Sequence, residues 1–146
     1  MSATAGHAEG TRTQADRLGV EPGAVVLEIG YDEDSDEALR TAVIDRAGAD
    51  FIGQDSDEVV DVVLLWWREG GDDDLVDDLM DAIGPLADSG VVWLLTPKVG
   101  RPGHVEPSDI NEAAPTAGLQ QTTSISAGRD WSGTRLVVPK SDRSRR

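Results

Sequence analysis

The chain has 146 residues, a length that suits one domain with its own core, and it contains no cysteine. Disulfides, thiolate metal sites and cysteine nucleophiles are therefore excluded. Its 28 acidic and 13 basic side chains give a net charge of −15, which disfavours nucleic acid and anionic membrane surfaces as partners. The N-terminus has no signal-peptide pattern and no apolar run is long enough to cross a bilayer, so we expect a cytoplasmic protein.

The two ends of the chain differ in composition from its middle. Residues 1–13 are small and polar, and we expect them to be disordered. Residues 140–146 combine basic residues with Ser and Asp, which predicts a disordered, solubilising tail, with a basic docking peptide as the alternative. Residues 14–139 are then expected to form a single α/β domain.

The first half of this domain alternates between strand and helix patterns. A short helix over residues 14–18 is expected first. The β-branched run Val25–Ile29, bounded by glycines, predicts a central strand buried on both faces. A helix follows, with an Asp34–Glu37 capping box at its start and Gly48 at its end. Residues 49–53 have the composition of a short strand.

The second half begins with the apolar run Val59–Leu65, the clearest buried strand of the sequence. A helix is expected next, with an apolar stripe at helical spacing and with Pro85 kinking or fraying its last turn. That stripe consists of Leu75, Leu79, Ile83 and Leu86. Residues 91–95 predict a third buried strand, which Pro97 stops.

The last elements predicted are a short helix and a hairpin. Ser108 is a suitable N-cap for a helix that runs through Ala114 and is halted by Pro115. Residues 119–127 and 134–138 predict two strands, joined by the loop that contains Trp131. Together the elements predict a single-domain, Rossmann-like α/β fold, with a mostly parallel sheet and a C-terminal antiparallel hairpin.

This order of elements resembles the sheet of the class I methyltransferases, which use S-adenosylmethionine. Residues 18–30 resemble the turn and first strand of those enzymes, and residues 79–95 resemble the helix and strand after their substrate-side loop. The resemblance implies a truncated methyltransferase-like topology. More narrowly, the whole chain resembles a family of small acidic actinobacterial proteins known as domain of unknown function 3052, for which no activity is established.

The loop that would hold the cofactor departs from the methyltransferase pattern, which is approximately E-x-G-x-G-x-G. Glu28 and Gly30 match it, but Asp32 and Asp34 replace the second and third glycines. Two carboxylates would crowd the cofactor and repel its methionine carboxylate. Only 28 residues separate Gly30 from Val59, too few for the usual strand, helix and strand. Asp50 and Asp55 do not fit the ribose-binding acid of those enzymes. We therefore expect the cofactor pocket to be lost and predict no cofactor.

Candidate ligand-binding residues lie where the first two long strands end, because open α/β sheets bind ligands beyond the carboxyl ends of their strands. These residues are Glu28, Gly30, Tyr31, Asp32, Trp66 and Trp67. Adjacent tryptophans on a strand point to opposite faces, so either could be packed or could contact a ligand. Trp131, in the predicted hairpin loop, is a second candidate contact with the same alternative.

The acidic stretch 32–37 is most simply the solvated start of a helix, with Mg²⁺, Ca²⁺ or a polar ligand as alternatives. Neither His7 nor His104 has a partner at a useful spacing, so we predict no metal site and no catalytic residues. Residues 69–81 predict a solvated helix face, with an acidic docking surface for a basic protein as the alternative.

The sequence leaves three functions open. A retained scaffold with a broken cofactor loop favours a non-catalytic binding or regulatory module, whose partner is a protein or a small polar ligand. The alternatives are a small-molecule methyltransferase with an atypical S-adenosylmethionine loop, and an oligomeric structural protein that pairs strands across subunits. Fold resemblance alone does not choose among them, because function depends on the site.

Overall fold

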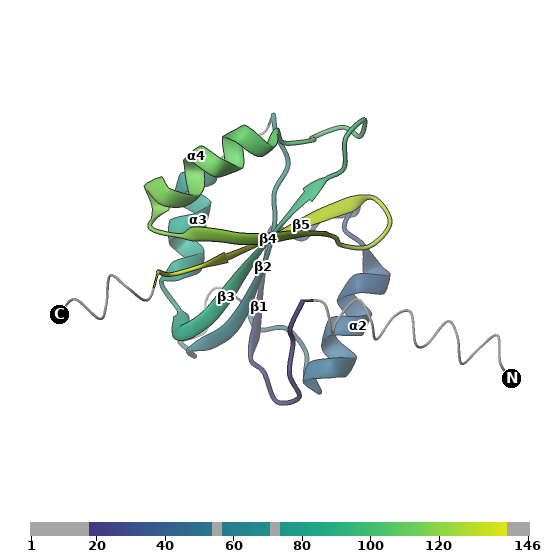
Figure 1. The fold of residues 1–146 in the computed structure, drawn as a ribbon. Helices are drawn as coiled ribbons and strands as arrows, with labels where there is room; N and C mark the ends of the chain where they lie inside the picture. Colours follow the sequence, from purple (N-terminus) through teal and green to yellow (C-terminus); the bar gives the residue numbers. More distant parts are fainter. Residues whose placement is uncertain (1–17, 54–56, 71–73, 140–146) are drawn as a thin grey trace, which may run out of the picture.

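The computed structural model of the chain describes residues 18–53, 57–70 and 74–139 (Figure 1). The predictions for residues 1–13 and 140–146 lie outside the described residues. The same is true of the predicted helix over 14–18, except for Leu18, which lies in a turn.

In the part of the chain that the structure describes, five strands form one mixed sheet with the order β1-β2-β3-β5-β4. β1, β2 and β3 are parallel, whereas β5 runs antiparallel to both β3 and β4. The sheet therefore confirms the predicted α/β fold with its C-terminal hairpin. The strands are β1 (Val26–Ile29), β2 (Val60–Trp66), β3 (Leu86–Pro97), β4 (Gln120–Ser126) and β5 (Trp131–Val137).

Within the described residues, helices α2, α3 and α4 cover the two faces of the sheet (Figure 1). α2 (Glu37–Ala47) lies on one face, and α3 (Leu75–Ile83) and α4 (Pro107–Ala117) lie on the other. Side chains of a strand alternate between faces, so β2 contributes Leu64 to the cluster with α2 and Leu65 to the cluster with α3 and α4. This double burial is why β2 is apolar at nearly every position.

β1 lies at an edge of the sheet and not at its centre as predicted. The strand expected over residues 49–53 is reduced to one bridge, in which the Ile52 N–H donates to the Val26 carbonyl at 2.9 Å. Val26 and Leu27 are still buried on opposite faces. Burial on both faces therefore explains the apolar run, but it does not reveal how many strands flank β1.

Helix α2 begins two residues later than the predicted capping box. Asp36 is its N-cap, with Oδ1 accepting from the Leu39 N–H at 2.9 Å, whereas Asp34 pairs with Arg68. The end at Gly48 is confirmed, because this glycine takes the left-handed conformation with φ 87°.

Prolines set the other helix boundaries differently from the prediction. α3 ends at Ile83, so Pro85 lies outside it, and Leu86 belongs to β3. The start of β3 at Leu86 is favoured because the Pro85 carbonyl accepts from the Val60 N–H of β2 at 2.8 Å. No helix in the described ranges is long and apolar enough to cross a membrane.

α4 is longer than predicted at both ends. Its N-cap is Glu106 and not Ser108, since Pro107 occupies the first helical position, where the missing N–H costs nothing. Pro115 lies inside the helix near its end, where it removes one backbone hydrogen bond, and Gly118 terminates the helix. The hairpin loop after β4 is shorter than predicted, because Trp131 begins β5 and is buried.

Candidate functional site

The carboxyl ends of β1 and β2 approach each other closely at Gly30. Its φ of +83° is in the left-handed region, which favours glycine, and a Cβ there would collide with the carbonyl oxygen of Trp66. The first glycine of the loop is thus required by the packing of two strand ends. Its presence is explained without a cofactor.

A charged pair lies directly beside this strand end. Arg40 of α2 donates from Nε to Glu28 Oε2 at 2.6 Å and from Nη2 to Glu28 Oε1 at 2.8 Å. Trp66 Nε1 donates to the same carboxylate at 2.9 Å, and the Glu28 side chain is only 9% exposed. The hydrogen bonds that Arg40 donates to Glu28 hold the pKa of Arg40 above its ordinary value.

Tyr31 covers the outer side of this pair. The Arg40 guanidinium carbon lies 4.1 Å from the centre of the Tyr31 ring, a cation–π distance, and the ring is half-exposed. The Tyr31 hydroxyl donates to Glu37 Oε2 at 2.6 Å. That hydrogen bond raises the pKa of Tyr31 and lowers the pKa of Glu37. The Tyr31 side chain therefore already has two partners within this chain, Arg40 and Glu37.

Arg68, two residues after β2, binds the acidic loop that follows Gly30. Its Nη2 lies 2.5 Å from Asp34 Oδ1 and its Nε lies 2.9 Å from Asp34 Oδ2. Its Nη1 donates to the Gly30 carbonyl at 2.9 Å, and Nη2 also reaches Ser35 Oγ at 3.2 Å. The hydrogen bonds from Arg68 lower the pKa of Asp34. Sequence reasoning missed both arginines, although a base directly after Trp66–Trp67 in so acidic a chain was a usable signal.

The loop is also held by the C-terminal hairpin. Trp131 Nε1 donates to the Asp34 carbonyl at 3.1 Å, and the rings of Trp66 and Trp131 meet edge to face at 4.8 Å. The Arg129 N–H donates to Asp36 Oδ2 at 3.1 Å. Trp131 is buried, so of the two alternatives left open for it, contact or packing, the structure shows packing.

The structure brings together five of the six predicted ligand-binding residues. Glu28, Gly30, Tyr31, Asp32 and Trp66 surround the end of β1. Trp67 is separated from them, because it packs on the opposite face of the sheet with α3 and α4. Both adjacent tryptophans are buried, so neither is the exposed contact that one alternative required.

Replacing Arg68 with methionine is expected to lower the free energy of unfolding at pH 7 by about 1 to 2 kcal/mol, through lost hydrogen bonds and one partly exposed ion pair. Because Arg68 lowers the pKa of Asp34, the ion-pair part is present above the unfolded pKa of about 3.9 and is lost as the pH falls through the lower folded pKa. The difference between wild type and variant should therefore shrink in acid, as measured by urea unfolding.

Arg101→Met is the matched control, because Arg101 forms a looser and more exposed pair with Asp130 at 3.6 Å. Its effect should be small at both pH values. An Arg68→Met effect that is the same at pH 7 and in strong acid would show that the Arg68–Asp34 attraction does not stabilise the fold.

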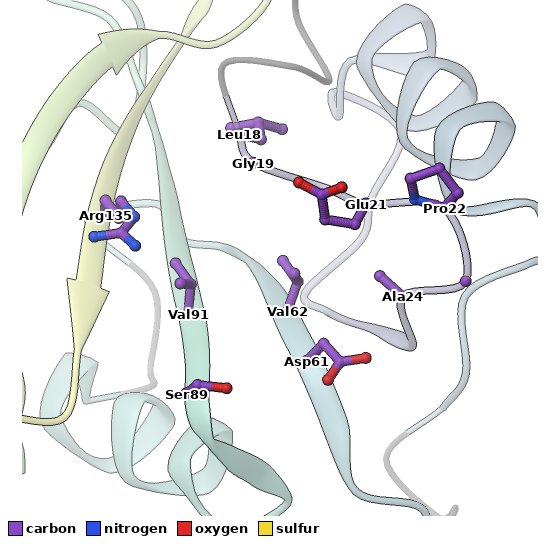
Figure 2. Close-up of a pocket in the computed structure, with 11 residues that line it drawn as sticks. Leu18, Gly19, Glu21, Pro22, Ala24, Asp61, Val62, Ser89, Val91 and Arg135 are labelled. Carbon is purple, nitrogen blue, oxygen red and sulfur yellow. The ribbon is translucent and has the colours of Figure 1, made fainter.

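Two cavities lie away from the closed strand end. One of them, of about 440 Å³, lies at the opposite end of β2 and β3. Its lining residues include Glu21, Asp61, Ser89 and Arg135 (Figure 2). Asp61 is already used there, since its Oδ2 accepts from the Val25 N–H at 2.9 Å. The other cavity, of about 640 Å³, lies beside Trp67, α3 and α4. No group of three metal-binding side chains occurs in the part of the chain that the structure describes.

The fold places the protein among α/β proteins with a methyltransferase-type sheet. It is similar to an S-adenosylmethionine-dependent methyltransferase from Aquifex aeolicus, with a TM-score of 0.60 and 11% identity over 88% of this chain and 89% of that one. It is also similar to one from Thiobacillus denitrificans in complex with S-adenosyl-L-homocysteine, with a TM-score of 0.56 and 14% identity over 90% and 91%. At these identities the likeness concerns the fold alone.

The chain belongs to the family described as protein of unknown function (DUF3052), which matches residues 15–140. It is 54% identical over 132 residues to uncharacterised proteins of Mycobacterium tuberculosis and Mycobacterium bovis, covering 90% of this chain and 82% of theirs. The family membership confirms the resemblance drawn from the sequence and assigns no activity.

Proposed function

We propose that this protein is a non-catalytic binding or regulatory module, in which the chain's own side chains close the place where a methyltransferase holds its cofactor. The observation that carries the proposal is the bidentate pairing of Arg40 with Glu28, at 2.6 and 2.8 Å. Glu28 matches the acid of the methyltransferase loop pattern. With both oxygens bound by Arg40 and one also by Trp66, this carboxylate offers little to a ligand.

The loop after Gly30 supports the same proposal. Asp34 stands where the pattern has its third glycine, and Arg68 binds both that carboxylate and the Gly30 carbonyl. Asp32, at the second glycine position, is exposed and would repel the methionine carboxylate of S-adenosylmethionine. The backbone there is occupied as well, since the Asp32 N–H donates to Ser35 Oγ at 3.0 Å.

The edge position of β1 is a further support. Methyltransferases of this class hold the cofactor ribose with an acid at the end of the strand that follows the first one. Here the only described remnant of that strand is the bridge at Ile52. Asp50 precedes this bridge and is exposed, so it is not at a strand end. Loss of the ribose contact and closure of the loop are consistent with one another.

Calorimetric titration with S-adenosylmethionine, and separately with S-adenosylhomocysteine, tests the proposal. We expect no heat of binding and no rise in melting temperature at high ligand concentration, because a ligand that binds the native state must raise that temperature. A methyltransferase known to bind the cofactor, titrated under the same conditions, is the positive control.

Saturable binding at micromolar affinity or tighter would contradict the proposal. Protection of the Gly30 and Tyr31 amides from hydrogen exchange would then locate the ligand at the end of β1. That result would favour the alternative of a small-molecule methyltransferase with an atypical loop.

A further inference from the structure

The two edges of the sheet are protected to different degrees. β1, at one edge, has four residues, and the Ile52 bridge covers part of it. β4, at the other edge, has seven residues, and in the part of the chain that the structure describes it pairs only with β5. Soluble proteins usually protect such an edge with charged side chains or proline, because its unpaired backbone groups can pair with another strand. β4 has neither, so its edge is open to pairing.

The absence of charge at this edge is unusual for this chain. Charged residues make up 28% of the sequence, yet none occurs in residues 113–128. β4 lies within this segment and is exposed at every position except Ile125, which is half-buried, so burial does not explain the missing charge. An exposed strand without charge is expected where another chain approaches the backbone, since the centres of protein interfaces are depleted of charged residues.

The pairing of β4 with β5 shows which backbone groups of β4 face outward. The Ala127 N–H donates to the Trp131 carbonyl at 2.9 Å, so Ala127 faces β5, and Ile125 is the next residue back along the chain that does so. Because this orientation alternates along an antiparallel strand, Ser124 and Ser126 direct their N–H and carbonyl groups away from β5. The register shift in this pair lies near the start of β4, so the end of the strand is regular.

We propose that two copies of this chain pair through β4, antiparallel about a two-fold axis at Ile125, and so join their sheets into one. Ser124 of each copy then faces Ser126 of the other, and each such pair exchanges two backbone hydrogen bonds. The half-buried Ile125 side chain, which packs against the cluster on the α2 face, meets its own copy across the axis. The contact is isologous, because each copy contributes the same residues.

Two features favour a second copy over an unrelated partner. Apart from Ile125, the side chains of β4 are those of Gln, Thr and Ser, each of which both donates and accepts, so the strand is complementary to itself. A chain with a net charge of −15 repels its own copy, and an uncharged edge is where that repulsion is smallest. A basic partner would instead be attracted to the acidic surface and would not require an uncharged strand.

Sedimentation equilibrium of the full chain tests the pairing. We expect the mass to rise from 15.5 kDa towards twice that value as the protein concentration approaches about 1 mM, because one strand pair makes a small interface. Added salt should tighten the dimer, since it screens the repulsion between two acidic chains. The Ser124 and Ser126 amides should become protected from hydrogen exchange as the dimer forms. The mass of a single chain at every concentration would overturn the proposal.

Charge-swapped variants of β4 test the register. Ser124→Glu/Ser126→Glu places carboxylates directly opposite each other and should weaken dimerisation at least about tenfold, and Ser124→Lys/Ser126→Lys should do the same with ammonium groups. An equimolar mixture of the two variants should recover the dimer, since each carboxylate then faces an ammonium group. Ala38→Glu/Thr41→Glu is the matched control, because both side chains are exposed on α2, and it should leave dimerisation unchanged.

Recovery in the mixture excludes misfolding as the reason why each variant alone is monomeric. A dimer that both β4 variants leave intact would place the contact elsewhere and overturn the proposal, and so would a mixture that stays monomeric. The inference goes beyond the proposed function, because β4 and β1 form opposite edges of the sheet. S-adenosylmethionine binding is followed by heat and at Gly30, whereas pairing is followed by mass, so failure of one proposal is distinguishable from failure of the other.

Discussion

Replacing Gly30 with alanine is expected to lower the free energy of unfolding by about 3 to 4 kcal/mol, the sum of left-handed backbone strain and a clash between strand ends. The φ of +83° alone disfavours a side chain, and the new Cβ would meet the Trp66 carbonyl oxygen. That oxygen is backbone at the end of β2, so it moves only if the strand moves. Urea unfolding at pH 7 measures the effect.

Gly48→Ala is the control, because Gly48 has a similar φ of +87° but its Cβ would meet nothing within 4 Å. It should cost only about 1 to 2 kcal/mol, the strain of the left-handed conformation. Suppose instead that Gly30→Ala and Gly48→Ala lower the free energy of unfolding equally. The close approach of β1 and β2 would then add nothing to the effect at Gly30, and packing would not explain the first glycine of the loop.

Replacing Arg40 with methionine is expected to lower the free energy of unfolding by about 3 kcal/mol, because it leaves the charge of Glu28 buried without its main partner. The side chains of Glu28 and Arg40 are only 9% and 21% exposed, so little water reaches the pair. The stacking of Arg40 against Tyr31 is lost in the same variant. Urea unfolding and the melting temperature report the change.

The double variant Glu28→Gln/Arg40→Met removes both charges and is the control for this prediction. It should be more stable than Arg40→Met alone, since no unpaired charge stays buried. If the double variant were instead less stable than wild type by the full sum of the two single-variant effects, Glu28 and Arg40 would not be coupled. The closure of the loop would then need another cause.

The Arg40–Glu28 pair and the Arg68–Asp34 pair flank the same loop and use arginines from different elements. Arg40 reaches it from α2, and Arg68 reaches it from the end of β2. Glu28 stands at the position of the acid in the methyltransferase pattern, and Asp34 stands at the position of its third glycine. A ligand of the cofactor's chemistry would have to displace two arginines to bind there.

The sequence alone predicted the main elements and the faces they bury. The runs that became β1, β2 and the second half of β3 are apolar at nearly every position, a pattern typical of strands covered on both sides. The departure from the glycine loop was equally visible, because Asp32 and Asp34 can be read directly against the pattern. Local composition was sufficient for these conclusions.

The partners of these residues depended on the tertiary structure. Glu28 is twelve positions from Arg40 and thirty-eight from Trp66, and Asp34 is thirty-four from Arg68. Contacts over such separations follow no period along the chain, so no local pattern predicts them. For the same reason the sequence placed β1 at the centre of the sheet, since an apolar run reports burial and not the number of neighbouring strands. Only the packing of α3 and α4 against the sheet decided that Trp67 lies on the face opposite to Trp66.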